Sequence, residues 1–189
     1  MKKIKIFALI GKAGSGKDFF LHEICSRMEV HEIISCTTRP IRDNEEPDIN
    51  YHYLTDEQFL SQQFIESCMF RGWRYGTRLK DLDENKPNVG VFNLSGIEQL
   101  MENKNIDLTI FYLDASDATR LIRQLQRESN PDINEIFRRF QTDNDDFSSE
   151  RINNIITKCK FYPIFNDTEN ETIYNVTKIE EIIKADFNS

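Results

Sequence analysis

The stretch from Gly11 to Asp18 holds the residues best suited to chemistry on a phosphorylated ligand. It reads G-K-A-G-S-G-K-D and fits the pattern G-x-x-x-x-G-K, with an acid where Ser or Thr usually follows. Glycines let such a loop curl so that backbone N–H groups point at phosphate oxygens, and the following helix adds its positive end. Lys17 supplies a charge for the β- and γ-phosphates of a nucleotide. The residues expected to bind phosphate are therefore Gly11, Lys12, Ala13, Gly14, Ser15, Gly16, Lys17 and Asp18.

Asp18 departs from the usual pattern, and two interpretations of it stay open. A Ser or Thr hydroxyl at this position would ligate Mg²⁺ beside the phosphates, and a carboxylate can do the same while adding a negative charge. Alternatively, Asp18 only occupies the first turn of a helix, where the dipole favours an acid. The first interpretation makes Asp18 the candidate metal ligand of the chain.

Arginines form a second kind of candidate site. Arg39 and Arg42 lie three residues apart on a loop stiffened by Pro40. Such a pair can clamp a phosphate, because the guanidinium fork matches its oxygens. The plain alternative is two exposed charges on a polar loop.

Four more arginines flank the polar stretch from residue 128 to 134. They are Arg123, Arg127, Arg138 and Arg139. Helical arginines are usually solvated, but concentrating them here in an acidic protein makes sense if they neutralise phosphates during a transfer.

Hydrophobic spacing predicts the elements that position these residues. Residues 4–10 form a nearly continuous apolar run, typical of a parallel strand buried on both faces. The helix after the loop has apolar residues at helical spacing: Phe19, Phe20, Ile24 and Met28. Further strands are expected at residues 33–34, 89–94 and 108–113. Strands that alternate with helices imply a parallel sheet with right-handed crossovers.

Two later helices are expected from S/T-x-x-E capping boxes. One box is Ser95 with Glu98, and the other is Thr177 with Glu180, which opens a last helix ending near Lys184. Residues 35–81, between the strands expected at 33–34 and 89–94, have a different pattern: polar loops, prolines, aromatics and short strand-like pieces. This stretch is expected to be an insert on the main sheet.

Composition and charge restrict the class of protein. The 189 residues fit one domain, and 39% hydrophobic with 30% charged residues is ordinary for a globular chain. The formal net charge is -8 and the sequence pI is ≈ 5.0, which disfavours a nucleic acid as partner.

Neither a disulfide framework nor a zinc site is indicated. The four cysteines are far apart without a CxxC pair: Cys25, Cys36, Cys68 and Cys159. The apolar run after Met1 stops at Gly11, shorter than a signal peptide's, and no stretch reaches the ~20 apolar residues of a membrane span. A cytoplasmic protein without a membrane partner is therefore expected.

The insert carries a motif that points to a family. Residues 35–42 read S-C-T-T-R-P-I-R and are followed by Glu45, Tyr51, F-I-E at 64–66 and Y-G-T at 75–77. This order resembles the guanylate kinase family, whose insert has the form S-x-T-T-R-x-x-R, then E, Y, F-x-E and Y-G-S/T. The similarity runs from the phosphate loop to Asn166 and Asp167, nearly the whole chain. The Gly-Lys-Asp ending of the loop resembles phage-type deoxynucleoside monophosphate kinases and phosphomevalonate kinases.

The resemblance implies a role for each matching residue. The monophosphate side is implied to comprise Ser35, Arg39, Arg42, Glu45, Tyr51, Glu66, Tyr75, Thr77 and Asn93. Of these, Arg39, Arg42, Tyr51 and Tyr75 are implied to hold the acceptor's phosphate, and Ser35, Glu66 and Thr77 to face the base. The ATP side is implied to add Arg123, Asn166 and Asp167 to the phosphate loop, with Asn166 and Asp167 in the segment near adenine. The transfer itself is implied to use Lys17, Arg127 and Arg139. The chemistry agrees, because a carboxylate accepts from the N1–H and N2–H₂ edge of guanine and hydroxyls can donate to O6.

Two positions depart from the family pattern. The strand before the helix of Gly96 usually carries two aspartates, one toward the metal and one toward the guanine amino group, but Val91 and Asn93 stand there. Metal support and strict guanine choice therefore stay open. Asp114 at the end of the next strand is either a partial replacement or a plain turn residue.

The resemblance implies a three-layer α/β P-loop NTPase fold with a parallel sheet. A single domain, 1–189, would comprise a core (1–34 and 82–189), a nucleoside-monophosphate-binding insert (35–81) and a short helical lid (about 123–139). The implied reaction is Mg²⁺-dependent phosphoryl transfer from ATP to GMP or dGMP by a monomer or homodimer. One alternative is a kinase for other nucleoside or deoxynucleoside monophosphates, and the other is a non-catalytic interaction module. The retained Gly11, Gly16 and Lys17 favour an enzyme.

Overall fold

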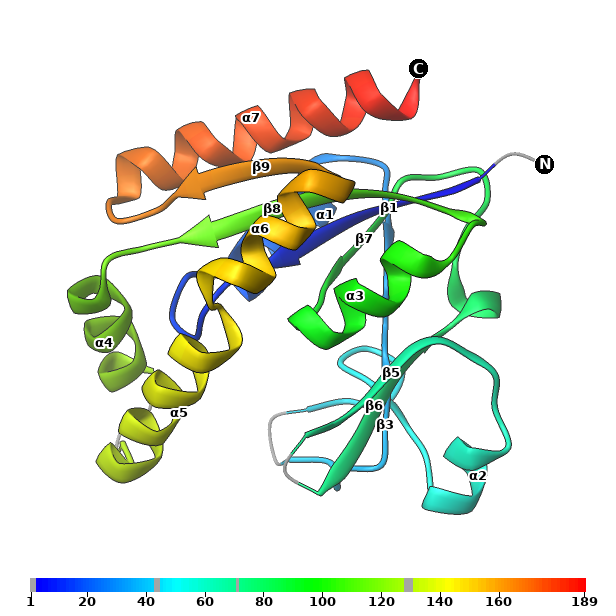
Figure 1. Ribbon diagram of the computed structural model, residues 1–189, viewed down its shortest axis with the longest axis horizontal. Coiled ribbons are helices and arrows are strands. Elements are labelled where there is room, and N and C mark those ends of the chain that lie inside the picture. Colours follow the sequence, from blue (N-terminus) through cyan, green and yellow to red (C-terminus); the bar gives the residue numbers. More distant parts are fainter. Residues whose placement is uncertain (1–2, 43–44, 71, 128–130) are drawn as a thin grey trace.

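The computed structural model describes residues 3–42, 45–70, 72–127 and 131–189. Strands and helices alternate along the chain, as expected for an α/β protein (Figure 1). The central sheet comprises β1 (Ile4–Ile10), β2 (His31–Glu32), β7 (Asn88–Val91), β8 (Ile106–Asp114) and β9 (Lys160–Phe165) in the order β2-β7-β1-β8-β9. All its neighbours pair in parallel. The carboxyl ends of the strands therefore meet at one edge, where ligands of such sheets bind.

Helices cover both faces of this sheet and make three layers. On one face, Ile6, Ala8 and Ile10 of β1 pack in a core with residues of α3 (Leu94–Glu102) and α6 (Ser149–Lys158). On the other face, Phe7 and Leu9 pack with residues of α1 (Lys17–Arg27) and α7 (Glu169–Phe187). Successive side chains of a strand point to opposite faces, so the continuous apolar run of β1 serves both cores.

A second, four-stranded sheet lies beside the first and is built from residues between 36 and 78. Its order is β4-β3-β6-β5, with β5 and β6 forming an antiparallel hairpin. The elements are β3 (Cys36–Thr37), β4 (His52–Tyr53), α2 (Asp56–Leu60), β5 (Phe64–Phe70), β6 (Trp73–Arg78) and the 3-10 helix η1 (Leu79–Asp81). Figure 1 shows this sheet below the central one, next to α3.

Two helices form the part of the chain expected to be a lid. They are α4 (Asp117–Gln126) and α5 (Ile133–Asp146), which lie at the end of the central sheet opposite the amino terminus (Figure 1). Of the expected range 123–139, residues 128–130 lie outside the described residues. In the described part of the chain, no helix combines the length and the apolarity needed to cross a membrane.

Four element predictions were wrong in their details. The strand expected at 33–34 is β2, His31–Glu32, and the strand expected at 89–94 ends at Val91. α3 is capped by Asn93, whose side chain accepts from the N–H of Gly96, and so the box at Ser95 and Glu98 is not used. The last helix starts at Glu169 with a capping box of Thr168 and Glu171, not at Thr177.

Candidate active site

The phosphate loop joins β1 to α1 and requires glycine at two crowded positions. Gly11 and Gly14 have φ of 153° and 81°, a region that residues with a Cβ rarely adopt. A Cβ on Gly11 would lie 2.2 Å from the carbonyl oxygen of Leu113, and one on Gly14 would lie 2.6 Å from that of Arg120. The glycines therefore let the loop pack closely against β8 and α4.

Lys17 lies inside this loop. Its Nζ donates to the carbonyl oxygens of Gly11 at 2.7 Å and Lys12 at 3.1 Å. Burial lowers the pKa of the Lys17 ammonium, and the negative charges of Asp18 and Asp143 oppose that shift. A bound phosphate would supply a stronger acceptor for this charge than two neutral carbonyls.

The residues expected near the adenine of ATP contact the loop or the start of α4. Asn166 is 2% exposed, and its Nδ2 donates to the carbonyl oxygen of Ser15 at 3.0 Å. Asp167 accepts from the N–H of Ser116 at 2.7 Å, and this bond lowers its pKa. Asn166 thus stabilises the phosphate loop through its hydrogen bond to Ser15. Contact of Asn166 or Asp167 with adenine stays a prediction. Arg123 donates to the carbonyl oxygen of Gly14 at 3.4 Å.

Arg39 is held in place by Glu45 on the insert. Arg39 is 9% exposed and donates to a Glu45 oxygen at 2.7 Å, while the Tyr53 hydroxyl and the Arg42 N–H donate to the other oxygen at 2.8 and 3.0 Å. The bond from Arg39 is the main reason that the pKa of Glu45 falls to about 2. Glu45 is an acceptor only and carries a negative charge, so it positions Arg39 and is poorly suited to contact a phosphate itself.

The Tyr51 ring lies beside the Arg39 guanidinium and packs against Tyr75. The guanidinium lies 5.5 Å from the centroid of the Tyr51 ring, and the Tyr51 and Tyr75 rings meet edge to face with centroids 5.9 Å apart. Aromatic faces attract guanidinium groups, and this packing limits their rotation. The four residues expected at the acceptor phosphate, Arg39, Arg42, Tyr51 and Tyr75, line one cavity.

Glu66 is a buried carboxylate on β5. It is 6% exposed, and desolvation raises its pKa, while bonds from Thr77 on the paired strand β6 oppose that shift. Ser35 contacts the Thr77 hydroxyl at 3.3 Å, so the three residues expected to face a base are together. A Cβ on Gly96 would lie 2.7 Å from Oε2 of Glu66, so the glycine makes room for the carboxylate.

Asn93 is placed differently from the expectation. Its carbonyl oxygen accepts from the N–H of Gly96 at 2.7 Å, and its amide nitrogen lies 2.9 Å from Sγ of Cys68. The carbonyl that was expected to face a base therefore caps α3. Val91 lies at the cavity wall without a polar group, and Asp114 is not among the residues lining the three cavities described below.

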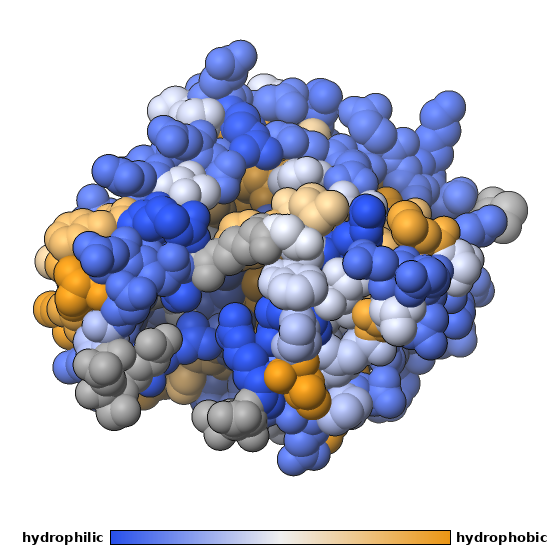
Figure 2. Space-filling model, turned by 90° about the horizontal axis from the view of Figure 1, so that it is seen from below, coloured by the Kyte–Doolittle hydropathy of each residue, from blue (hydrophilic) through white to orange (hydrophobic). Residues whose placement is uncertain are grey.

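Three cavities around the phosphate loop share lining residues and form one depression. The arginine cavity (≈ 620 Å³) is lined by Asp18, Arg39, Arg42, Arg127 and Arg139 among others. The Glu66 cavity (≈ 750 Å³) is lined by Lys17, Ser35, Glu66, Val91 and Asn93 among others. The loop cavity (≈ 450 Å³) is lined by Gly16, Lys17, Asp18, Arg123 and Arg127 among others. Figure 2 shows that this face of the molecule is hollowed and largely hydrophilic.

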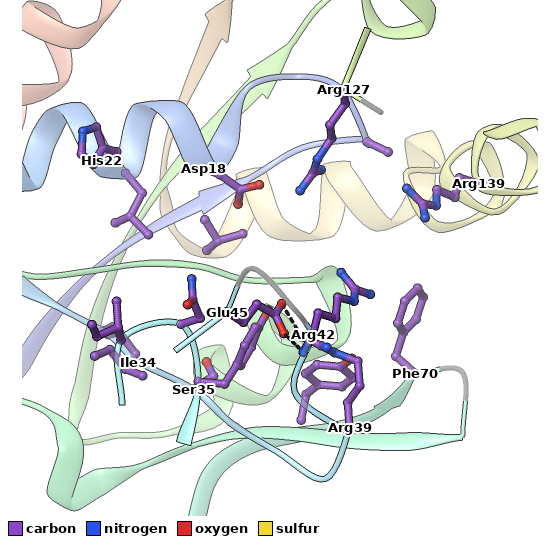
Figure 3. A pocket seen from close by; sticks show the side chains of 18 of the residues that line it. Asp18, His22, Ile34, Ser35, Arg39, Arg42, Glu45, Phe70, Arg127 and Arg139 are labelled. Atoms are coloured by element: carbon purple, nitrogen blue, oxygen red, sulfur yellow. Dashed lines mark hydrogen bonds and ion pairs between the residues drawn. The ribbon is translucent and has the colours of Figure 1, made fainter. Parts of the chain in front are cut away.

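The arginines lie on opposite sides of the arginine cavity. Figure 3 shows Arg127 and Arg139 with Asp18 on one side and Arg39 and Arg42 on the other. Arg127 is the C-cap residue of α4 and Arg139 lies in α5, whereas the second pair belongs to the insert. The depression can thus hold two phosphate-bearing groups between the loop and the insert, with cations on both sides of the gap.

Two residues of this region were not predicted from the sequence. Arg120 on α4 is 1% exposed and donates to Asp117 at 2.6 Å and to Asp143 on α5 at 2.9 Å. Asp143 also accepts from the N–H of Ala13 in the phosphate loop at 2.7 Å. No local pattern marks these partners, because more than 100 residues separate Asp143 from Ala13.

The residues present can supply part of a Mg²⁺ site. Mg²⁺ beside a nucleotide is usually held by one or two carboxylates together with phosphate oxygens and water. Asp18 meets this need, since its exposed carboxylate lines both the arginine cavity and the loop cavity. Within the described residues, no three His, Cys, Asp or Glu side chains form a metal-binding group.

Comparisons with known proteins find guanylate kinases among the similar sequences and folds. The chain is 36% identical over 93 residues to the guanylate kinase of Thermotoga maritima, a match that covers 47% of this chain and 44% of that protein. It is 28% identical over 190 residues to the guanylate kinase of Prochlorococcus marinus subsp. pastoris, covering 95% and 98% of the two chains. The fold matches the crystal structure of guanylate kinase from Anaplasma phagocytophilum with a TM-score of 0.63 at 16% identity, over 100% of this chain and 89% of that chain. Residues 3–184 match the family described as guanylate kinase, and the chain therefore belongs to the guanylate kinase family.

Proposed function

We propose that this chain transfers the γ-phosphoryl group of ATP to GMP or dGMP, giving ADP and the diphosphate. The observation that carries the proposal is the depression in which the phosphate loop, Arg127 and Arg139 face Arg39 and Arg42 of the insert. The loop and Lys17 suit a triphosphate, whereas Arg39 and Arg42 suit the phosphate of a second nucleotide. The whole-chain family match supports the same reaction.

Side chains have little covalent chemistry to do in such a transfer. Lys17, Arg127 and Arg139 would stabilise the charge that spreads over the transferred group, because these cations line the loop cavity. Arg39 and Arg42 would hold the acceptor phosphate so that its oxygen attacks in line. Closure of the depression over both nucleotides would keep water from competing for the phosphoryl group.

Mg²⁺ would complete the site on the side of Asp18. Bound there, the ion would neutralise charge on the phosphates of ATP. Asp18 is the residue proposed to support it, because Val91 has no ligand atom and the Asn93 carbonyl oxygen caps α3.

For Asp18, we expect Asp18→Asn to raise the Mg²⁺ concentration needed for half-maximal rate by about 10-fold, because the carboxylate is the stronger ligand. A Mg²⁺ titration of kcat/KM for ATP measures this. Asp56→Asn, an exposed acid on α2, is the control. If the titration curve does not move and only the free energy of unfolding drops, by up to about 1 kcal/mol, Asp18 serves the helix dipole alone.

For the insert arginines, Arg39→Ala and Arg42→Ala should each lower kcat/KM for the monophosphate by about 10- to 100-fold, which corresponds to about 1.5–3 kcal/mol for a lost charge-assisted contact. The KM for ATP should change far less. Arg74→Ala is the matched control, since Arg74 pairs with Asp56 at 3.2 Å outside the cavities. Equal losses for both nucleotides would show that these arginines have another role.

The Asn93→Asp variant tests whether residue 93 accepts a hydrogen bond from the guanine amino group. In Asn93→Asp, one oxygen can keep the cap on Gly96 and the other replaces the amide nitrogen that now contacts Cys68. A carboxylate oxygen would accept from the N2 amino group of guanine, so the GMP to IMP ratio of kcat/KM should rise by about 10-fold. An unchanged ratio means that Asn93 lies away from the base. Asn93→Ser, which can still cap, controls for loss of the helix.

The reaction itself is tested by a coupled assay of ADP release across all common ribo- and deoxynucleoside monophosphates. GMP and dGMP should give the highest kcat/KM. A higher value for another nucleotide would favour the alternative kinase. Absence of turnover together with absence of ATP binding, measured by calorimetry, would favour an interaction module instead.

A further inference from the structure

One carboxylate on α5 reaches the phosphate loop and closes a ring of three hydrogen bonds. Oδ2 of Asp143 accepts from the N–H of Ala13 at 2.7 Å and from Nη2 of Arg120 at 2.9 Å. Nε of Arg120 donates to the carbonyl oxygen of Ala13 at 3.0 Å. Both peptide groups of Ala13 are therefore held, one by α5 and the other by α4.

Burial and contacts outside the ring restrict the position of the Arg120 side chain. Its side chain is 1% exposed, its guanidinium carbon lies 4.3 Å from the centroid of the Phe140 ring, and Nη1 donates to Asp117 at 2.6 Å. Removing a partner from a buried arginine leaves an uncompensated charge. Arg120 thus has few alternative positions, and Asp143 is held by a rigid donor.

Asp143 shares a face of α5 with a lid arginine. Residues four apart lie on the same side of a helix, so Arg139 is one turn before Asp143, and both line the arginine cavity. Nε of Arg139 donates to Glu135 at 2.8 Å, which keeps the guanidinium along the helix. A second link ties the same region to the loop, because Nζ of Lys12 donates to Oδ1 of Asn144 at 3.0 Å. The position of Arg139 relative to the phosphate loop therefore depends on the distance between α5 and that loop.

We propose that Asp143 is a positioning residue for phosphoryl transfer. Through Arg120 and Ala13 it joins α5 to the phosphate loop and thereby sets Arg139 against the phosphates of ATP. The consequence for catalysis rests on the proposed function, whereas the ring itself does not.

The ring is tested without turnover by hydrogen exchange of the Ala13 amide in the ligand-free protein. In Asp143→Ala, this amide loses its acceptor and should exchange at least about 10-fold faster than in the wild type. Asp145→Asn, an exposed acid on the same helix, should leave the exchange unchanged. Equal exchange in Asp143→Ala and the wild type would overturn the ring.

The positioning role is tested by a double-mutant cycle on kcat. Asp143→Ala should lower kcat by at least about 10-fold with a smaller change in KM for the monophosphate, and Asp143→Asn, which keeps an acceptor oxygen, should lose less. In an Arg139→Ala background, the same change should cost less than about 3-fold, because Asp143 acts through Arg139. Equal losses in both backgrounds would overturn the role and leave Asp143 as a structural brace. Absence of kinase activity in the wild type would instead refute the proposed function and this role with it, while the exchange result would still report on the ring.

Discussion

Replacing Lys17 by alanine should lower kcat by at least about 100-fold while the fold survives, as expected when a group that stabilises transition-state charge is removed. Lys17 is the cation inside the phosphate loop, and its present acceptors are two carbonyl oxygens of that loop. Burial already disfavours its charge, as the lowered pKa shows. The loop thus holds a poorly solvated charge that a phosphate would stabilise.

The effect should appear in kcat more than in the thermal stability. Coupled assays at saturating ATP and GMP measure the first, and circular dichroism on heating measures the second. Lys104→Ala, an exposed lysine between α3 and β8, is the control and should retain the wild-type rate. Near wild-type turnover in Lys17→Ala would refute the assignment of the phosphate loop. Lys17→Met keeps the length of the side chain and separates loss of charge from loss of packing.

The sequence predicted β1, β8 and the phosphate loop because their signals are local, whereas β9 was not predicted. The apolar run of β1 contributes side chains to both cores. The glycines that follow have positive φ angles, which residues with a Cβ rarely adopt. The helix after the loop was predicted for the same reason, although Phe19, read as part of its apolar stripe, is exposed. Phe20 and Ile24 are the buried residues of this helix, and Leu21 and Met28 pack against the same core.

Helix starts were harder because the same short pattern occurs more than once. T-x-x-E is present at Thr168 and at Thr177, and both fit a capping box, but only the first is used. The second lies inside α7, where the buried residues Val176 and Ile179 keep the chain helical. Tertiary packing therefore decided between two equal local signals.

The candidate site was predicted as a set of residues but not in its internal contacts. The arginines, Tyr51 and Tyr75 line the expected cavity, yet Glu45 proved to hold Arg39 and Asn93 proved to cap α3. Such contacts depend on which neighbour a side chain meets after folding. The same holds for Asp143, whose partner in the phosphate loop is 130 positions away.

Glu66 is expected to determine the choice of base. Glu66 is buried at the wall of the Glu66 cavity, and it pairs with Thr77 on the neighbouring strand β6. An ionised carboxylate accepts from the N1–H and N2–H₂ groups of guanine, whereas adenine has an acceptor at N1 and no N2 amino group. Adenine would leave this buried carboxylate with no donors beyond those of Thr77. We therefore expect kcat/KM for GMP to exceed that for AMP by at least about 1000-fold.

Glu66→Gln should reduce that ratio by about 100-fold or more, because the amide has one acceptor atom and no charge. Glu57→Gln, an exposed glutamate on α2 in the same insert, should leave the ratio unchanged. AMP as the better acceptor of the wild type, or an unaltered ratio in Glu66→Gln, would show that Glu66 does not face the base.

The raised pKa of Glu66 adds a test by pH. Desolvation favours the protonated form, so the carboxyl takes up its proton at a higher pH than an exposed glutamate would. Only the ionised form can accept from both donors of guanine. As pH falls through this raised pKa, kcat/KM for GMP should fall while the KM for ATP stays constant, and in Glu66→Gln the fall should be absent. Rate profiles between about pH 4.5 and 8 would measure this, bounded below by the ordinary pKa of a glutamate. The same acid limb in both proteins would assign the titration to another group and remove Glu66 from the recognition of the base.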